Sequence, residues 1–242
     1  MTSAILIVGA TGGIGSALAR RLSAGGASLF LTGRDESRLA ALGAEIGASY
    51  AVVDATDFSD MDRIGDRAHA ELGRIDGMVN CAGSLLLKPA HLTKSDEFHA
   101  TIATNLTTAF AVVRTAARLM TDGGAVVLCS SAAARVGLAN HEAIAAAKAG
   151  VLGLMLSAAA TYATRGLRVN AVAPGLVRTP MTARITASAS ATEASRAMHA
   201  LGRLGEPDDV AAMIAWLLGD DARWITGQCF GVDGGLGTVR AK

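Results

Sequence analysis

The sequence predicts a single α/β domain built on a doubly wound, Rossmann-type parallel sheet with helices on both faces. Three observations support this fold class. Short apolar runs of strand length alternate with helical stretches along the 242 residues. The runs are apolar at successive positions, which is typical of parallel strands that are buried on both faces. A glycine-rich turn follows the first run and opens the first helix, as in a nucleotide-binding βαβ unit.

The strand-like runs follow one another from the N-terminus to the C-terminus. AILIV and SLFLT are short, apolar and rich in β-branched or aromatic residues, and five later runs share this character. The predicted strands are 4–8, 28–32, 50–53, 77–80, 125–129, 167–172 and 229–232. Because no repeat or proline-rich linker interrupts the series, residues 1–242 are expected to form one domain.

Helical stretches separate most of these runs. The first is SALARRLSAGG, and the second begins at DESRL with Asp35 as the expected N-cap. The remaining helices are predicted at 59–72, 96–121, 142–164 and 207–219. The segment 179–205 differs because it is rich in Ala, Ser and Thr and has no strand pattern. It is interpreted as a mobile helical lid over the carboxyl ends of the strands. The alternative is a surface helix pair with no role in the site.

Composition excludes several classes of function. The chain is 51% apolar and has 22 basic against 21 acidic side chains, so no basic field favours nucleic acid or a membrane surface. The longest later uncharged apolar stretch, 149–164, is too short to span a bilayer comfortably. Three scattered cysteines and the absence of metal-ligand spacing argue for a reducing compartment and against a metal site. A cytoplasmic protein that binds neither nucleic acid nor membranes is expected.

The turn VGATGGIG has the features of a phosphate-binding loop. Gly9, Gly13 and Gly15 follow the spacing GxxxGxG directly after the first strand. Such a turn lets the backbone approach a diphosphate, and the helix N-terminus stabilises its charge. Dinucleotide binding is therefore predicted at the loop residues Gly9, Thr11, Gly12, Gly13, Ile14 and Gly15. The alternative is a tight turn without a ligand.

The end of the second strand bears on which nicotinamide cofactor is bound. An acidic residue there would bind the ribose 2′-hydroxyl, whereas an arginine accommodates a 2′-phosphate. The expected acidic position is Gly33, and Arg34 follows it. Asp35 could compete for the hydroxyl, but capping of the next helix is the preferred interpretation. NADP(H) is therefore predicted over NAD(H), with Arg34 on the phosphate.

Motifs in order along nearly the whole chain resemble those of the short-chain dehydrogenase/reductase family. The segments that carry the resemblance are VVDATD around Asp54, NCAG at 80–83, TNL at 104–106, VLCSS at 127–131, AAAKAG around Lys148, VNAVAPGLVRTPM at 169–181, GEPDDVA at 205–211 and VDGG at 232–235. No single motif is specific, but together they are. Cys81 stands where the family usually has a second Asn.

This resemblance implies roles for individual residues. Asp54 would contact adenine, and Asn80 and Lys148 would contact the ribose. Ser131 would hold the substrate oxygen, and Asn105 would support a water-linked relay to Lys148. The remaining cofactor-binding positions implied by the motifs are Ala55, Ala82, Gly83, Pro174, Gly175, Val177 and Thr179.

The resemblance fails at one catalytic position. The family's YxxxK pair places its tyrosine four residues before Lys148, where this chain has Ile144, 13 residues after Ser131. Tyr162 lies on the same predicted helix but roughly 21 Å beyond Lys148, which is too far for it to substitute. The family's tyrosine donates the proton to the carbonyl oxygen, so another donor is needed.

Three functions remain open. An active NADPH-dependent carbonyl reductase could use His141, which would share a helix stripe with 144 and 148 if the helix extends that far. Glu142 is a weaker candidate, and ordered water or an acidic substrate such as a quinone or polyphenol would also serve. Alternatively, the chain is a catalytically silent NADP-binding sensor or scaffold, or a purely structural module.

Two further expectations concern the substrate and the assembly. Ser84 to Leu87 and the lid residues Met181, Ile185, Met198 and Leu201 would line an apolar pocket for an apolar or aromatic carbonyl or hydroxyl compound. The alternative is that these are ordinary core positions. By family resemblance, broad apolar faces on the helices at 96–121 and 142–164 imply a homodimer or homotetramer.

Overall fold

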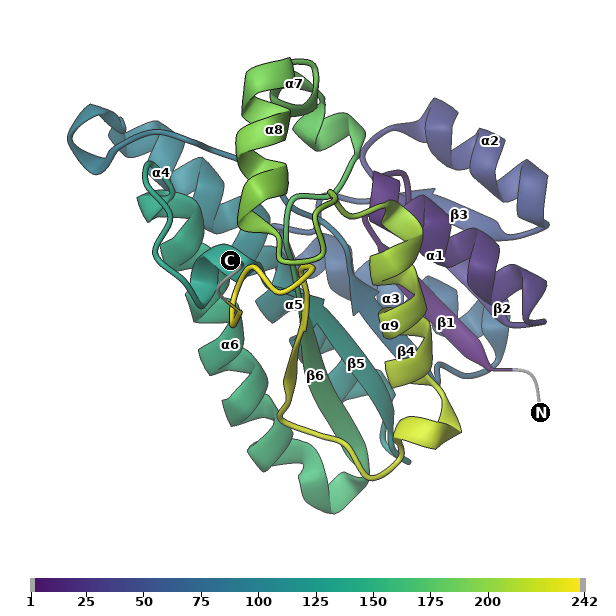
Figure 1. Ribbon diagram of the computed structural model, residues 1–242. Helices are drawn as coiled ribbons and strands as arrows, with labels where there is room; N and C mark the ends of the chain where they lie inside the picture. The colour runs from purple at the N-terminus through teal and green to yellow at the C-terminus, as the bar shows by residue number, and fades with distance from the viewer. Residues whose placement is uncertain (1–2, 240–242) are drawn as a thin grey trace.

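The seven strands found in the described part of the chain lie in one parallel sheet. A computed structural model describes residues 3–239, and its strand order is β3-β2-β1-β4-β5-β6-β7 (Figure 1). The sheet grows outward from β1 in one direction and from β4 in the other, which confirms the doubly wound topology. The strands are Ala4–Val8 (β1), Ser28–Gly33 (β2), Ser49–Val52 (β3), Gly77–Asn80 (β4), Gly124–Cys129 (β5), Leu167–Pro174 (β6) and Cys229–Val232 (β7).

Helices cover both faces of this sheet. One face carries α1 (Gly13–Ala24), α2 (Glu36–Ile46) and α9 (Pro207–Leu218). The other carries α3 (Phe58–Leu72), α5 (Thr108–Leu119) and α6 (Glu142–Tyr162), with α4 (Ser95–Ile102) beside α6. The carboxyl ends of the strands lie beneath α7 (Ala183–Thr186) and α8 (Ala189–Met198).

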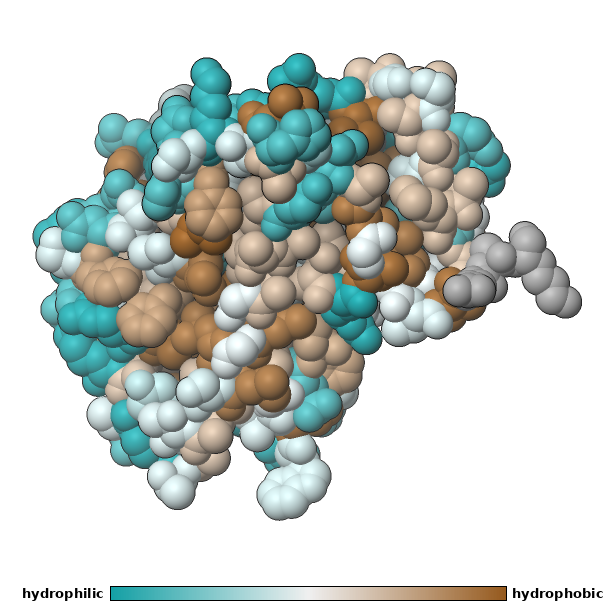
Figure 2. Space-filling view, turned by 90° about the vertical axis from the view of Figure 1, so that its left-hand side faces the viewer, coloured by the Kyte–Doolittle hydropathy of each residue, from teal (hydrophilic) through white to brown (hydrophobic). Residues whose placement is uncertain are grey.

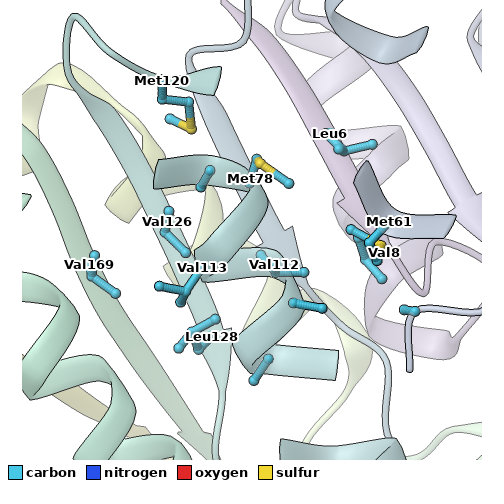
Figure 3. Packing of buried hydrophobic residues seen from close by; sticks show 14 of the residues in the cluster. Leu6, Val8, Met61, Met78, Val112, Val113, Met120, Val126, Leu128 and Val169 are labelled. Atoms are coloured by element: carbon cyan, nitrogen blue, oxygen red, sulfur yellow. The ribbon is translucent and has the colours of Figure 1, made fainter. Parts of the chain in front are cut away.

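The two covered faces explain why the strands are apolar at successive positions. In β1, Leu6 and Val8 point into the core beneath α3 and α5, whereas Ile5 and Ile7 point to the opposite core. Figure 3 shows the first of these cores, where helix residues such as Val112 pack on the strands. Successive side chains of a strand alternate between faces, so burial on both faces requires an uninterrupted apolar run.

The predicted helix at 96–121 contains an irregular turn. Helix α4 ends at Ile102, a π-helical turn spans Ala103–Thr107, and α5 begins at Thr108. Such π-helical turns inside α-helices are rare and often occur at functional sites. This turn places Asn105, whose side chain is buried, at the carboxyl edge of the sheet.

Helix α6 is apolar on most of its surface. The stretch Glu142–Arg165 is long and apolar enough to cross a membrane by length and composition alone. However, Val151, Met155 and Ala158 pack into the core beside β5 and β6, so α6 is a core helix of this fold. Figure 2 shows further apolar side chains on one outer face of the molecule. The exposed large hydrophobic residues include Phe98 of α4, Phe110 of α5 and Leu156 of α6.

Candidate active site

A cavity of about 970 Å³ lies at the carboxyl ends of the strands, between the glycine-rich turn and α8. This is where open α/β sheets bind their ligands. The predicted site residues that line it are Gly9, Thr11, Gly12, Gly13, Ile14, Gly15, Arg34, Asp54, Ala55, Ala82, Gly83, Asn105, Ser131, His141, Lys148, Pro174, Gly175, Val177 and Thr179. Thus the fold brings together residues from almost the whole length of the chain.

Three glycines of the glycine-rich turn have no room for a side chain. Gly9 has φ +80°, and a Cβ there would lie 2.5 Å from the amide nitrogen of Ala82. A Cβ on Gly13 would lie 2.7 Å from Cγ2 of Thr179, and one on Gly15 would collide with the carbonyl oxygen of Gly9. Helix α1 begins here without a side-chain cap or an acidic residue in its first turn. Its first amide groups are therefore available to an anion such as a diphosphate.

Charged side chains gather at one end of the cavity. Asp35 caps α2 by accepting a hydrogen bond from the backbone nitrogen of Arg38 at 3.0 Å, as predicted. Arg34 is exposed and lines the cavity. Arg38 also lines it and donates to the carbonyl oxygen of Thr11. No motif in the sequence pointed to Arg38. The only available signal was its position one turn after the N-cap of a helix, which keeps the side chain near the loops at the strand ends.

Asp54 lies at the same end of the cavity. Its carboxylate accepts hydrogen bonds from the hydroxyl and the backbone nitrogen of Thr56, at 2.7 and 3.0 Å. These bonds stabilise the charged form, so the pKa of Asp54 is below its ordinary value. The carboxylate is thus held ionised and oriented beside the space expected for adenine.

The side chain of Asn80 is held by two hydrogen bonds. It is buried, with Nδ2 donating to Oγ1 of Thr108 at 3.1 Å and Oδ1 accepting from the amide of Ala82 at 3.1 Å. Its expected contact with a ribose stays a prediction. The side chain fixes the turn after β4 against α5, because both of its polar ends need partners in the core.

Lys148 and Asn105 approach each other across Gly83. A Cβ on Gly83 would lie 3.0 Å from Oδ1 of Asn105 and 3.6 Å from Nζ of Lys148. Nζ donates to the carbonyl oxygen of Cys129 at 2.8 Å, and burial lowers the pKa of Lys148. Asn105 donates to the hydroxyl of Ser84 at 3.0 Å and to the carbonyl oxygen of Thr101 at 2.9 Å.

The two serines after β5 have different surroundings. Ser130 is buried, and its hydroxyl donates to the backbone carbonyl of Lys148 at 2.8 Å, which ties β5 to α6. The hydroxyl of Ser131 is half-buried and accepts a hydrogen bond from the amide of Ala133 at 3.2 Å. Its own hydrogen is therefore free to point at a ligand in the cavity.

The position four residues before Lys148 faces the cavity. Ile144 lines it and is 3% exposed. Helix α6 begins at Glu142, so His141 is the N-cap residue and not part of the helical stripe considered above. Its Nδ1 lies 2.7 Å from the carbonyl oxygen of Ala139. Nδ1 must therefore carry a hydrogen, and Nε2 is the nitrogen left for other partners.

The segment 179–205 covers the cavity with Met181, Ile185 and Met198. Leu201, which was also expected in the lining, is 72% exposed and lies outside this cavity. The buried ring of His199 secures the segment, because Nδ1 bonds to the carbonyl oxygen of Ser195 at 2.6 Å and Nε2 accepts from the amide of Leu176 at 3.2 Å. No local pattern in the sequence marks His199 for this role.

Known proteins resemble the chain over nearly its full length. A family model described as enoyl-(acyl carrier protein) reductase matches residues 9–237. Cis-4-hydroxycyclohexanecarboxylate dehydrogenase of Sinomonas cyclohexanicum is 39% identical, covering 97% of this chain and 96% of that protein. L-rhamnose 1-dehydrogenase (NAD(P)(+)) of Azotobacter vinelandii is 36% identical, covering 96% and 95%. The structure of a short-chain type dehydrogenase/reductase from Mycobacterium ulcerans matches with a TM-score of 0.94 at 34% identity, covering 100% and 93%.

These likenesses and the cavity define the class of protein. The chain belongs to the short-chain dehydrogenase/reductase family. It is an oxidoreductase of the type that acts on hydroxyl or carbonyl compounds, and homologous enzymes use NAD or NADP. Among residues 3–239, no group of three or more His, Cys, Asp or Glu side chains could hold a metal ion.

Proposed function

We propose that the protein is an NADPH-dependent reductase of a ketone or quinone-like carbonyl that works without an aromatic hydroxyl in its active site. The observation that carries this proposal is the shared lining of the cavity. Ser131, Lys148 and Asn105 surround the space beside Ile144, while a complete phosphate-binding turn occupies the other end. The residues for binding and for polarising a carbonyl are present, and only the usual proton donor is missing.

Two guanidinium groups support the choice of NADPH. Arg34 and Arg38 line the cavity beyond β2, where Gly33 offers no carboxylate to a ribose hydroxyl. Asp35 is engaged as the cap of α2. Arginine suits a phosphate because its planar donors match the phosphate oxygens, so a 2′-phosphate is the preferred ligand at this end.

At the other end, side chains stabilise the charge that develops on the carbonyl oxygen. When bound, NADPH supplies the hydride. Ser131 donates a hydrogen bond to the oxygen, and the buried ammonium of Lys148 favours negative charge nearby while also binding ribose hydroxyls. His141 is the proposed proton donor, through Nε2. Since Nδ1 already carries a hydrogen, Nε2 can give a proton only from the doubly protonated ring.

The lining beside Ile144 indicates an apolar substrate. Met181, Ile185, Met198, Leu87 and Leu138 contribute aliphatic surface there. Such a pocket favours an alicyclic or aromatic ring through burial of apolar area. The Sinomonas relative named above is a cis-4-hydroxycyclohexanecarboxylate dehydrogenase, and the name of its substrate contains an alicyclic ring.

A second candidate function rests on the same position. Ile144 has no proton to give, so a protein that binds NADP and signals its presence, without turnover, would tolerate this side chain. The presence of Ser131 argues against this candidate, because nucleotide binding alone does not require this serine.

For either function we propose that the protein forms a homodimer or homotetramer in the cytoplasm. The exposed apolar face beside α4, α5 and α6 is the proposed contact between subunits.

The experiment that tests the proposal is NADPH oxidation by the purified protein against a panel of ketones, quinones and aldehydes. Lys148→Ala is the control, because it removes the buried ammonium. Turnover by the wild type that is lost in the control would support the reductase. Tight NADPH binding without turnover on any compound would favour the sensor instead.

A further inference from the structure

Two cysteines that are remote in the sequence meet at the floor of the cavity. Cys81 directly follows β4, and Cys129 is the last residue of β5. These strands are neighbours in register, with Asn80 opposite Leu128, so the next residues, Cys81 and Cys129, also lie opposite each other. Neighbouring strands are about 4.8 Å apart, and Cα atoms joined by a disulfide are usually about 4.4–6.8 Å apart. The backbone therefore already holds this pair within bonding reach.

The two thiols are not equivalent. Interaction between the two thiols raises the pKa of Cys81 and lowers that of Cys129. The ammonium of Lys148 also lowers the pKa of Cys129. The remaining titratable group lining this end of the cavity is His141. Cys129 is thus the better nucleophile, and Cys81 is the neighbour that can react with it next.

Both cysteines belong to the cavity wall. Each lines it and is half-buried, and all three cysteines of the chain are free thiols in the structure. The proposed reduction uses neither sulfur. Cys229 on β7 offers an internal comparison, because β6 separates it from Cys129 and burial raises its pKa.

We propose that Cys81 and Cys129 form a redox-active dithiol that a hydroperoxide converts to a disulfide. The sulfur of Cys129, as thiolate, attacks the peroxide oxygen and becomes a sulfenic acid, and one equivalent of water or alcohol leaves. The thiol of Cys81 then attacks the sulfenic sulfur, the S–S bond forms, and a water molecule leaves. Overall the two thiols lose two protons and two electrons, which reduce and cleave the peroxide O–O bond.

The site also links oxidation to cofactor binding, a step that rests on the proposed function. The backbone of Cys81 lies beside Gly9 of the glycine turn, and the carbonyl oxygen of Cys129 accepts a hydrogen bond from Lys148, so a dinucleotide bound between the turn and Lys148 would cover this part of the cavity. A ligand that binds only the reduced protein stabilises the reduced state by mass action. NADPH should therefore shield the dithiol, and oxidation should lower the affinity for NADPH.

Hydrogen peroxide treatment followed by intact-mass measurement and peptide mapping tests the dithiol. The wild type and Cys229→Ser should lose two hydrogens, yield a peptide linking positions 81 and 129, and recover with dithiothreitol. Cys81→Ser should stop at a sulfenic acid on Cys129, trapped by dimedone, and Cys129→Ser should react at least tenfold more slowly. A missing 81–129 link, or equal oxidation of Cys229, would overturn the proposal.

The protection is tested separately, with the cross-link as the readout and NADPH binding measured by calorimetry. Saturating NADPH should slow formation of the link at least tenfold. Equal rates with NADPH demonstrably bound would overturn the placement of the dithiol under the cofactor. If calorimetry detects no NADPH binding while the apo chain still forms the link, the proposed function fails and the dithiol stands.

Discussion

The two ends of the cavity are built from different parts of the polypeptide. At the phosphate end, the backbone makes the site: glycines bring the chain close, and the N-terminus of α1 offers its amide groups. At the reaction end, side chains make the site, and each is oriented by a specific partner, as Lys148 is by the carbonyl oxygen of Cys129. Backbone geometry tolerates almost no substitution, whereas one side chain can be replaced without disturbing its neighbours.

This difference shows how binding and chemistry can separate in one fold. In the proposed function Ile144 stands where a proton donor is expected, and its aliphatic side chain is well buried, so we expect the sheet and the cofactor end to keep their structure. Changes at the reaction end should therefore alter turnover at constant affinity for the cofactor. Changes at the phosphate end should alter affinity first.

The largest expected effect is an increase in kcat caused by a substitution at the reaction end. Ile144→Tyr returns a hydroxyl four residues before Lys148 and should raise kcat by about 10²- to 10⁴-fold, the usual contribution of a positioned general acid. Ile144→Phe adds a similar ring without the hydroxyl and should give no gain. Steady-state rates of NADPH oxidation for the two variants and the wild type decide the matter. Equal rates for Tyr and Phe would show that proton donation is not limiting.

At the phosphate end, the corresponding expected effect is a loss of NADPH affinity in Gly15→Ala. Its Cβ collides with the carbonyl oxygen of Gly9, so the turn must open and NADPH affinity should fall by about 100-fold, equivalent to about 3 kcal/mol. Gly153→Ala on α6 meets no atom within 4 Å and should instead stabilise the protein by about 0.5–1 kcal/mol. Calorimetric titration and thermal unfolding measure the two quantities. Unchanged NADPH affinity in Gly15→Ala would place the diphosphate elsewhere.

A smaller effect at the reaction end tests the proposed proton donor. His141→Ala should lower kcat at least tenfold while the dissociation constant of NADPH stays the same, because the ring lies at the start of α6 and away from the glycine turn. His91→Ala removes a ring outside the cavity lining and serves as the control. An unchanged kcat in His141→Ala would eliminate this histidine and leave ordered water as the donor.

Selectivity between cofactors should depend on Arg34. Arg34→Ala should weaken NADPH binding by about tenfold and leave NADH binding unchanged, since a charge-assisted bond to a phosphate contributes about 1.5–3 kcal/mol. Fluorescence titration with both cofactors makes NADH the internal control. A wild type that binds both equally would contradict the assignment of Arg34 to a 2′-phosphate.

The smallest expected effect lies outside both ends, where α9 begins. Arg203 donates to the Asp209 carboxylate, and this lowers the pKa of Asp209 to about 2. The contribution to stability is therefore complete above about pH 4 and lost as pH falls toward 2. Because the side chain is 34% exposed, we expect only about 1 kcal/mol from it.

Asp209→Asn should lower stability by that amount at pH 7, and the difference from the wild type should shrink as the pH falls through about 2. Asp208→Asn is the matched control, since its side chain is 73% exposed in the same turn of α9. Denaturant unfolding at several pH values measures both. A constant deficit at all pH values would mean that the Asp209 carboxylate is not what stabilises this turn.

The sequence by itself determined the order of strands and helices, the phosphate-binding turn and the cap at Asp35. These features depend on periodicity and on short motifs, which act within one or two turns of chain. The resemblance of its motifs to the short-chain dehydrogenase/reductase family also marked Ser131, Lys148 and Asn105 as residues of one site.

Only the tertiary structure decided where certain side chains point and which distant residues touch. Asn80 turned into the core because Thr108 offered its buried amide a partner, and His141 fell just outside α6. Cys81 and Cys129, which composition treated as scattered, became neighbours through the register of β4 and β5. Such contacts depend on the pairing of segments far apart in the chain, and local sequence patterns do not specify which segments pair.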